Sequence, residues 1–126
     1  MTAPRFEAVP PAAGPRVQGF SGRDFLVDGT PYRAVLLTPE TAAAWDPPAL
    51  EALAEADVEP LLAGDPPPEF LLLGTGPALA FPPRAFRAAL EARGIGIESM
   101  DSRAAARAWT VLRAEGRRSA AALITL

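Results

Sequence analysis

The chain has 126 residues, of which 49% are hydrophobic and 21% charged, and its formal net charge is −3. This length and composition predict one soluble globular domain with a single core, and no apolar run is long enough to span a bilayer. The sequence has no histidine, cysteine, lysine or asparagine. It therefore lacks most side chains that serve as bases, nucleophiles or soft metal ligands, which argues against an enzyme and predicts no catalytic residue, metal site or cofactor.

Charge is unevenly distributed along the chain. Residues 1–101 hold seven arginines and fourteen acidic residues, whereas residues 102–126 hold five arginines and only Glu115. The net charge is therefore −7 in the first part and +4 in the second. A net acidic chain with one short basic segment is a poor match to nucleic-acid binding, so we expect no nucleic-acid partner.

The first residues read as a tail. Residues 1–15 are rich in proline and alanine and show little periodicity, which predicts an extended segment before a single α/β domain over residues 16–126. They contain no continuous apolar stretch of the kind found in a secretory signal, and we therefore expect a cytoplasmic location.

Short β-like runs follow the tail. Residues 25–27 and 32–37 are apolar and are separated by Asp28-Gly29-Thr30-Pro31, a typical hairpin signal. Pro39 is expected to close this β region. Asp46-Pro47-Pro48 then predicts a helix start with Leu50 and Leu53 on its apolar face, and a second helical turn over residues 57–64.

The second half alternates strands and helices. Apolar strands are predicted at residues 70–74, 95–99 and 119–125. One helix opens at Pro82-Pro83, and another is capped by Asp101 or Ser102. The run of four apolar residues from position 70 indicates a central strand covered on both faces, and the order of elements makes two βαβ units.

The carboxyl ends of the first two of these strands form the first candidate site. Gly74-Thr75-Gly76 follows one strand, and Met100 and Asp101 end the next, so parallel neighbours would bring them together in a crevice. The glycine loop is a poor match to a dinucleotide or phosphate loop, because Pro77 lacks an amide hydrogen and Leu79 stands at the third glycine position. Two simpler interpretations are a sharp exit turn at the glycines and a helix cap at Asp101.

The second candidate site is the arginine-bearing side of the last helix. Arg103 and Arg107 are four residues apart, where like charges on a helix repel each other. A solvated face explains this spacing, and so does an acidic partner surface or an internal carboxylate. Trp45 is similarly either a core anchor or an interface residue.

Most of the chain resembles a known family. The residues that carry the resemblance are Leu72-Leu73-Gly74-Thr75-Gly76, Phe81, Pro83, Gly94-Ile95-Gly96-Ile97-Glu98, Met100-Asp101-Ser102, Ala104-Ala105, Arg107 and Glu115-Gly116-Arg117. The first half fits more loosely, through Gly19-Phe20, Tyr32, Val35-Leu36-Leu37, Pro39 and Trp45. They are similar to those of the family of mitochondrial respiratory complex I assembly factor 3 and related bacterial conserved proteins of unknown function. The resemblance implies a three-layer α/β domain with a mixed, partly parallel central sheet. That architecture agrees with the βαβ units and the N-terminal β-hairpin region.

The resemblance also suggests a function. It implies a non-enzymatic protein-interaction module, an accessory in assembling a respiratory membrane complex, whose partner is a subunit of that complex or another assembly factor. Where that family often has Cys-Arg-Thr-Tyr-Asn, this chain has Ala106-Arg107-Ala108-Trp109-Thr110, so only a role for Arg107 carries over. The alternative is a small-ligand-binding protein or an enzyme that uses the crevice. Homo-oligomerisation is left open.

Overall fold

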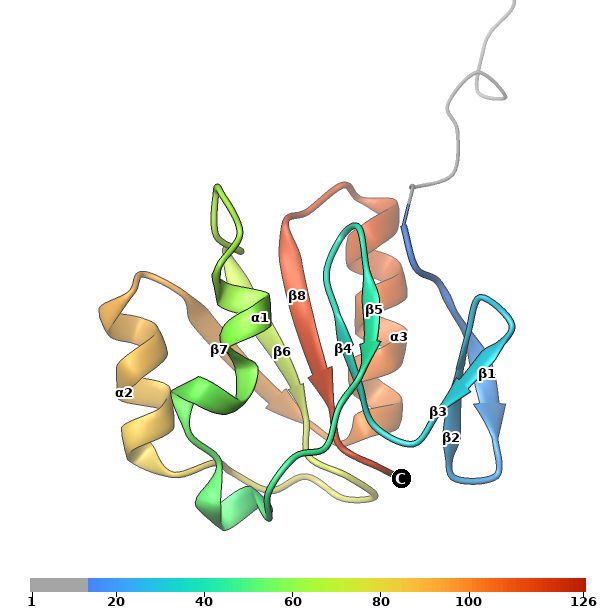
Figure 1. The fold of residues 1–126 in the computed structure, drawn as a ribbon, viewed down its shortest axis with the longest axis horizontal. Coiled ribbons are helices and arrows are strands. Elements are labelled where there is room, and N and C mark those ends of the chain that lie inside the picture. The colour runs from blue at the N-terminus through green and yellow to red at the C-terminus, as the bar shows by residue number, and fades with distance from the viewer. Residues whose placement is uncertain (1–13) are drawn as a thin grey trace, which may run out of the picture.

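The computed structural model describes residues 14–126, so the expected tail lies outside the described residues except for Gly14 and Pro15 (Figure 1). The strands are β1 (Val17–Ser21), β2 (Asp24–Val27), β3 (Thr30–Tyr32), β4 (Val35–Leu37), β5 (Ala42–Ala44), β6 (Phe70–Gly74), β7 (Gly96–Met100) and β8 (Ser119–Leu123). The α-helices are α1 (Glu59–Leu62), α2 (Arg84–Ala92) and α3 (Ser102–Ala114), and the 3₁₀ turns are η2 (Leu50–Ala52) and η3 (Glu55–Val58).

The centre of the molecule is a five-stranded mixed sheet. Its strand order is β5-β4-β8-β6-β7, with β6 parallel to both β7 and β8 and with β4 antiparallel to β8 and β5. The predicted strand at residues 70–74 is β6, and it lies inside the sheet as expected. This arrangement confirms the predicted α/β class with a mixed, partly parallel sheet.

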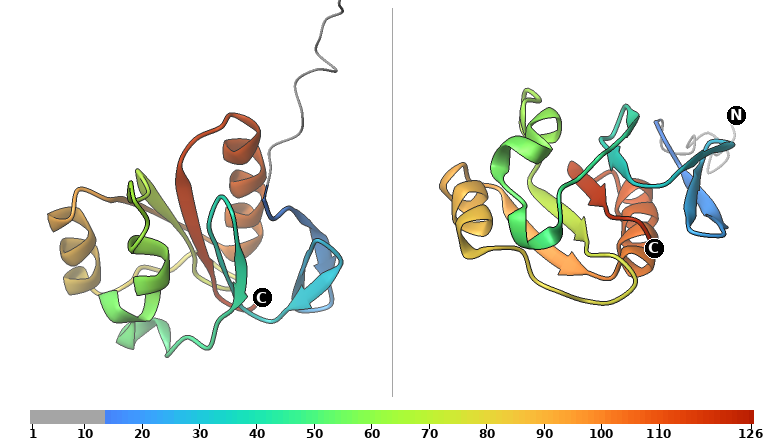
Figure 2. Two further views of the ribbon diagram at one scale, coloured as in Figure 1. Left: turned by 45° about the horizontal axis from the view of Figure 1, so that its top comes forward. Right: turned by 60° about the horizontal axis from the view of Figure 1, so that its bottom comes forward.

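The helices cover both faces of this sheet (Figures 1 and 2). The chain moves outward from β6 to β7 through α2 and then returns across β6 to β8 through α3. Because both crossovers are expected to have the same hand, reversing the direction places the two helices on opposite faces. Thus α1 and α2 lie on one side of the sheet, and α3 lies on the other.

Alternation along the strands divides the core into two clusters. In β6, Leu71 and Leu73 pack under α1 and α2, whereas Leu72 packs under α3. The first cluster also includes Phe86 and Leu90 of α2. Around α3 the core residues are Phe25, Val27, Val35, Leu37, Leu72, Ala105, Ala106, Trp109, Ala121 and Leu123. The four successive apolar residues of the β6 run are explained by this two-sided burial.

The N-terminal region forms a second, antiparallel sheet with the order β1-β2-β3. Its predicted hairpin turn is present, since Asp28 and Gly29 have φ of 49° and 84° and connect β2 to β3. The apolar run of residues 32–37 is not one strand, however. It divides between β3 in the small sheet and β4 in the central sheet, which lets the hairpin fold back against α3.

Two predictions between residues 38 and 58 are wrong. The β region does not close at Pro39, because Thr38 turns the chain and β5 pairs with β4. No helix starts at Asp46; the backbone becomes helical only at η2, η3 and α1. Trp45 is the reason for the extended segment, because its indole packs on the core and its Nε1 donates to the Asp57 carbonyl at 3.0 Å. Trp45 is therefore a core anchor.

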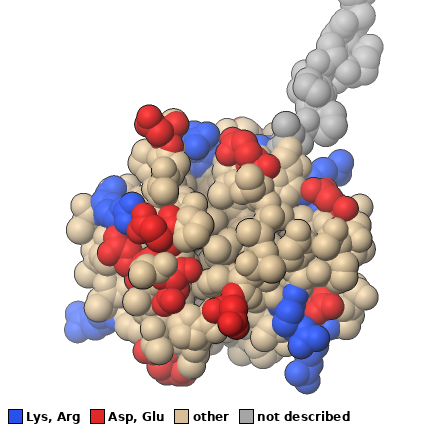
Figure 3. Space-filling view, in the orientation of Figure 1, with Lys and Arg blue, Asp and Glu red and all other residues tan. Residues whose placement is uncertain are grey.

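An arginine ties the helical segments together on an acidic surface. Figure 3 shows acidic side chains gathered over the α1 and α2 side of the molecule. Arg93, at the end of α2, contacts Glu55 at 2.8 Å and Glu59 at 3.0 Å. The hydrogen bond from Arg93 holds the pKa of the Glu59 carboxyl below its ordinary value of 4.5.

This contact predicts an acid-dependent loss of stability. A carboxyl whose folded-state pKa is depressed stabilises the fold above its unfolded pKa and loses that contribution as the pH falls through the folded value. We expect the free energy of unfolding of the Arg93→Met variant, measured with urea, to fall less between pH 6 and pH 3 than that of the wild type. Equal losses in the two proteins would contradict this role of Arg93.

Burial of Trp109 predicts a large stability effect. Its side chain is fully buried between the sheet and the N-terminal hairpin, and its replacement by alanine should cost about 3–5 kcal/mol. In a domain of this size we expect the Trp109→Ala melting temperature to fall by more than about 10 °C. Val111→Ala is the matched control on the same helix, because Val111 is exposed. A Trp109→Ala loss no larger than that of the control would show that the hairpin does not depend on this contact.

Candidate functional site at the carboxyl edge of the sheet

The predicted crevice residues do come together. Strands β6 and β7 are parallel neighbours in register, with Gly74 opposite Met100. The Thr75 amide donates to the Met100 carbonyl at 2.8 Å. The glycine loop, Met100 and Asp101 therefore meet at one edge of the sheet, as expected for the ends of parallel strands.

A serine fills the junction between them. The buried hydroxyl of Ser102 accepts from the Gly76 amide at 2.8 Å and donates to the Ile124 carbonyl at 2.6 Å. The Ser102 amide donates to the Gly76 carbonyl at 2.8 Å. One side chain at the start of α3 thus joins the ends of β6 and β8, and the amides that could have cradled an anion are already hydrogen bonded within the chain.

The two glycines of the loop serve different purposes. A Cβ at Gly74 would lie 2.8 Å from the Ser102 hydroxyl and 3.0 Å from a methyl group of Leu123, so position 74 must be bare for α3 to dock. Gly76 has φ of +104°, a conformation that side chains rarely adopt. The sharp-turn interpretation of the sequence therefore has a physical basis at both positions.

Asp101 is a helix cap. Its backbone is extended, and its Oδ1 accepts from the Ala104 amide at 2.9 Å, in the geometry of an N-cap. The cap explains this residue without a ligand or a metal. Within residues 14–126, no three acidic side chains are grouped in a way that could hold a metal ion.

Thr75 organises the loop that follows, a feature that the sequence analysis missed. Its hydroxyl donates to the Ala78 carbonyl at 2.7 Å and accepts from the Ala80 amide at 3.1 Å. The loop held in this way turns Leu79 and Phe81 outward, and these side chains are 56% and 70% exposed. The available signal was two large apolar residues without helical or strand periodicity between Pro77 and Pro82.

The two arginines of the second candidate site are exposed on α3. The Arg103 guanidinium lies over the Phe20 ring, with Cζ 5.0 Å from the ring centroid. Arg107 borders a hollow of about 200 Å³ between α3 and β1. Among residues 14–126, neither arginine forms an ion pair with a carboxylate, so the structure offers no internal partner in this range for the Arg107 charge.

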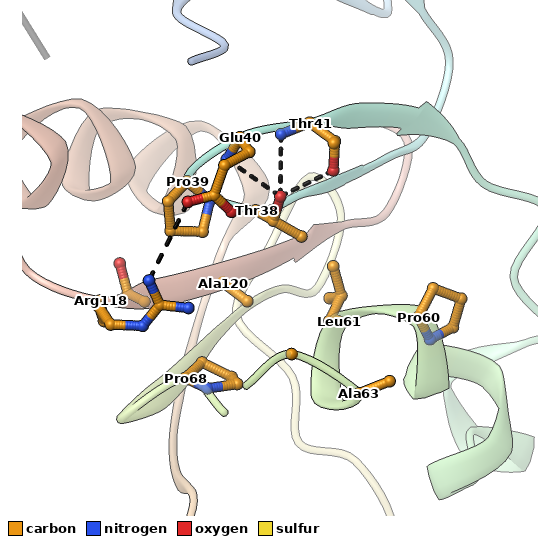
Figure 4. Close-up of a pocket in the computed structure, with 12 residues that line it drawn as sticks. Thr38, Pro39, Glu40, Thr41, Pro60, Leu61, Ala63, Pro68, Arg118 and Ala120 are labelled. Carbon is orange, nitrogen blue, oxygen red and sulfur yellow. Dashed lines mark hydrogen bonds and ion pairs between the residues drawn. The ribbon is translucent and has the colours of Figure 1, made fainter. Parts of the chain in front are cut away.

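A separate pocket of about 280 Å³ lies at the opposite edge, beside the start of β8 (Figure 4). Arg118 borders it and contacts Glu40 at 4.0 Å and the Pro66 carbonyl at 3.0 Å. The Thr38 hydroxyl accepts from the amides of Glu40 and Thr41. These polar groups bind one another, whereas the buried Arg118 Nε and the Ser119 hydroxyl, which also line the pocket, have no hydrogen-bond partner within residues 14–126.

Comparison with known proteins places this arrangement among uncharacterised relatives. A family model described as a protein of unknown function (DUF498/DUF598) matches residues 17–124. An uncharacterised protein of Rhodobacter capsulatus is 34% identical over 116 residues, which cover 87% of this chain and 84% of that one.

Two solved structures share the fold. A crystal structure of a Bordetella parapertussis protein has a TM-score of 0.79 and 30% identity, covering 93% of this chain and 100% of that one. A Bartonella henselae protein, described as an outer membrane protein, has a TM-score of 0.80 and 25% identity, covering 90% of this chain and 97% of that one. No helix within residues 14–126 of the present chain is long and apolar enough to cross a bilayer.

The junction predicts a strong coupling between Gly74 and Ser102. Gly74→Ala should lower the free energy of unfolding by about 2 kcal/mol or more, because the new methyl overlaps Ser102. Ser102→Ala should cost a similar amount, because it leaves the buried Gly76 amide and the partly buried Ile124 carbonyl unpaired. Urea unfolding of both variants and of the double variant measures the coupling, which should be non-additive. Gly96→Ala, where a Cβ would meet only ordinary contacts, is the control, and additive losses would contradict the filled junction.

Proposed function

We propose that this chain, which belongs to the DUF498/DUF598 family of proteins of unknown function, is a non-enzymatic protein-interaction module. The observation that carries this proposal is the loop after β6, which holds two large apolar side chains in the solvent beside a junction that is closed by internal hydrogen bonds. Contact surfaces between proteins are built around such apolar and aromatic anchors.

The loop is suited to binding because it is ordered before a partner arrives. The Thr75 hydroxyl bonds to both sides of the turn, at Ala78 and Ala80, so Leu79 and Phe81 are presented without a large loss of backbone entropy on binding. Phe81 is 70% exposed, so burying its ring under a partner would make a favourable contribution to the free energy of binding.

The arginines of α3 supply the charge of the proposed surface. Arg103 is the second residue of α3, and the Ser102 amide before it bonds to the glycine loop. The basic face therefore begins at the edge of the sheet from which the apolar loop departs. We propose that an acidic partner surface neutralises Arg103 and Arg107, with the apolar loop providing most of the affinity and the arginines the orientation.

The biological setting is part of the proposal and rests on the resemblance to the complex I assembly factor family. We propose a cytoplasmic accessory in assembling a respiratory membrane complex, with a subunit of that complex or another assembly factor as the partner. Fractionation of cells into cytoplasm and membranes tests the location, and recovery of the protein with an assembly intermediate tests the role.

The alternative function, a ligand-binding or catalytic crevice, receives no support from the geometry of the junction. A ligand there would have to displace the Ser102 hydroxyl from the Gly76 amide and the Met100 carbonyl from the Thr75 amide. Each displaced pair is a buried or partly buried hydrogen bond, and the ligand would have to replace both.

The proposed surface predicts a clear mutational pattern. Replacing Leu79 and Phe81 together by serine should leave the melting temperature within about 2 °C of the wild type, because exposed side chains contribute little to stability. The same variant should lose the partner that co-purifies with the wild type from native lysate with its membrane fraction included. Arg107→Glu should also lose it, and Arg103→Glu should weaken it less.

The matched control is Arg87→Glu, which reverses an arginine on α2, on the face of the sheet opposite to α3 and further along the chain from the apolar loop. It should retain the partner. Retention of the same partner by the Leu79 and Phe81 variant would contradict the loop as an interface. A fall of several degrees in the melting temperature of Arg107→Glu would show instead that Arg107 acts within the fold.

A further inference from the structure

Among residues 14–126, no strand pairs with the outer edge of β7. This strand is the last in the sheet order, and its hydrogen bonds run to β6. The Gly96 amide donates to Glu69, and the Met100 carbonyl accepts from Thr75. In a parallel ladder alternate residues bond to the same neighbour, so the amide and carbonyl groups of Ile97 and Ser99 point away from β6, toward the open edge.

A groove lies beside this edge, on the α3 side of the sheet. It has a volume of about 690 Å³. Its apolar lining comes from two strands and one helix and includes Phe70, Leu72, Met100, Ala108, Val111 and Leu112. Helix α3 packs over β6 and β8 more than over β7, which leaves the outer part of this sheet face uncovered, and Val111 on the helix wall is 56% exposed.

The charged side chains of the groove that are not in ion pairs are acidic. Glu98 of β7 and Glu115 at the end of α3 both line it, and neither is in an ion pair with any residue of the described range. Arg117, which also lines the groove, already has partners. Its guanidinium lies 3.8 Å from the Glu69 carboxylate, and its Cζ lies 5.5 Å from the centroid of the Phe70 ring. The groove therefore offers two carboxylates to an occupant.

Self-association through this edge is disfavoured by the same charges. In the antiparallel register that pairs all five residues of β7 with a second β7, Glu98 of each copy lies directly opposite Glu98 of the other. Like charges at such a cross-strand position are destabilising. An occupant with a basic side chain opposite Glu98 would be attracted to that carboxylate, whereas a second copy of the chain would be repelled by it.

We propose that the free edge of β7 and the adjoining groove bind an extended segment of another protein, with basic and apolar side chains alternating along one face. Its backbone adds a sixth strand to the sheet through Ile97 and Ser99. The side chains on its α3 face point into the groove, where an apolar residue meets Leu72 and Met100 and basic residues meet Glu98 and Glu115. This surface is separate from the loop that carries Leu79 and Phe81.

The test uses a synthetic peptide and the full chain. The probe is a fluorescein-labelled peptide with the sequence Thr-Lys-Thr-Leu-Thr-Lys-Thr, in which one strand face carries both lysines and the leucine. The control peptide has glutamate in place of both lysines. Fluorescence anisotropy measures both affinities at low and high salt, and chemical shifts of the backbone amides locate the binding. We expect saturable binding of the basic peptide alone, weakened by salt, with the largest shifts at Ile97 and Ser99.

Two variants separate the backbone contribution from the charge contribution. Ser99→Pro removes the outward amide but no bond to β6, and proline is tolerated at such an edge position. The Ser99 hydroxyl makes no hydrogen bond within the described residues, so its loss adds little. Glu98→Lys reverses a groove charge, and Glu51→Lys reverses an exposed charge elsewhere. Melting curves confirm that each variant is folded.

Ser99→Pro and Glu98→Lys should each weaken the basic peptide about tenfold, the change expected when one good contact is lost, and Glu51→Lys should leave it unchanged. The proposal is overturned if the basic peptide does not saturate at millimolar concentration, if the acidic peptide binds equally well, or if Ser99→Pro has no effect. A wild-type dimer that Ser99→Pro converts to a monomer would also overturn it, because a second copy would then occupy the edge.

Discussion

The buried hydroxyl of Ser102 is the contact on which the arrangement of the rest of the molecule depends. It accepts from the loop after β6 and donates to the backbone after β8, while its own amide returns to the loop. Three segments that are distant in sequence are therefore held by one side chain at the start of α3. The position of α3 then determines where the N-terminal hairpin packs, because Phe25 and Val27 share a core cluster with Trp109. Any shift of α3 along the sheet would break these hydrogen bonds in a region from which water is excluded.

Sequence patterns predicted the βαβ half of the chain well because burial and local geometry agree there. The run at 70–74, the helix start after Pro82-Pro83 and the cap at Asp101 each follow from a local rule. The failures have a different physical origin. The split of residues 32–37 between two sheets and the extended segment after Trp45 are decided by long-range contacts, to β8 and to Asp57. A window of neighbouring residues contains no information about such contacts.

The candidate site shows the same division. The adjacency and the parallel direction of the two strands could be predicted, so the meeting of the glycine loop with Met100 and Asp101 was foreseen. The role of Ser102 was not, because a serine beside an aspartate at a helix start looks like an alternative cap. Only the close approach of Gly74 explains why the smallest polar side chain stands at that position. Thr75 was read as part of a turn, whereas its hydroxyl in fact sets the shape of an exposed loop.

Strand β8 has a consequence for how this protein can vary. Ala120, Ala121 and Ala122 are all buried, so the middle of the strand that lies between β4 and β6 carries little side-chain bulk on either face, and Leu123 is the large buried side chain at its end. Enlarging any of these alanines would require a compensating reduction in a helix on the same side of the sheet. Substitutions that enlarge an alanine of β8 should therefore be accompanied by a smaller side chain on the helix that packs against the same face of the sheet.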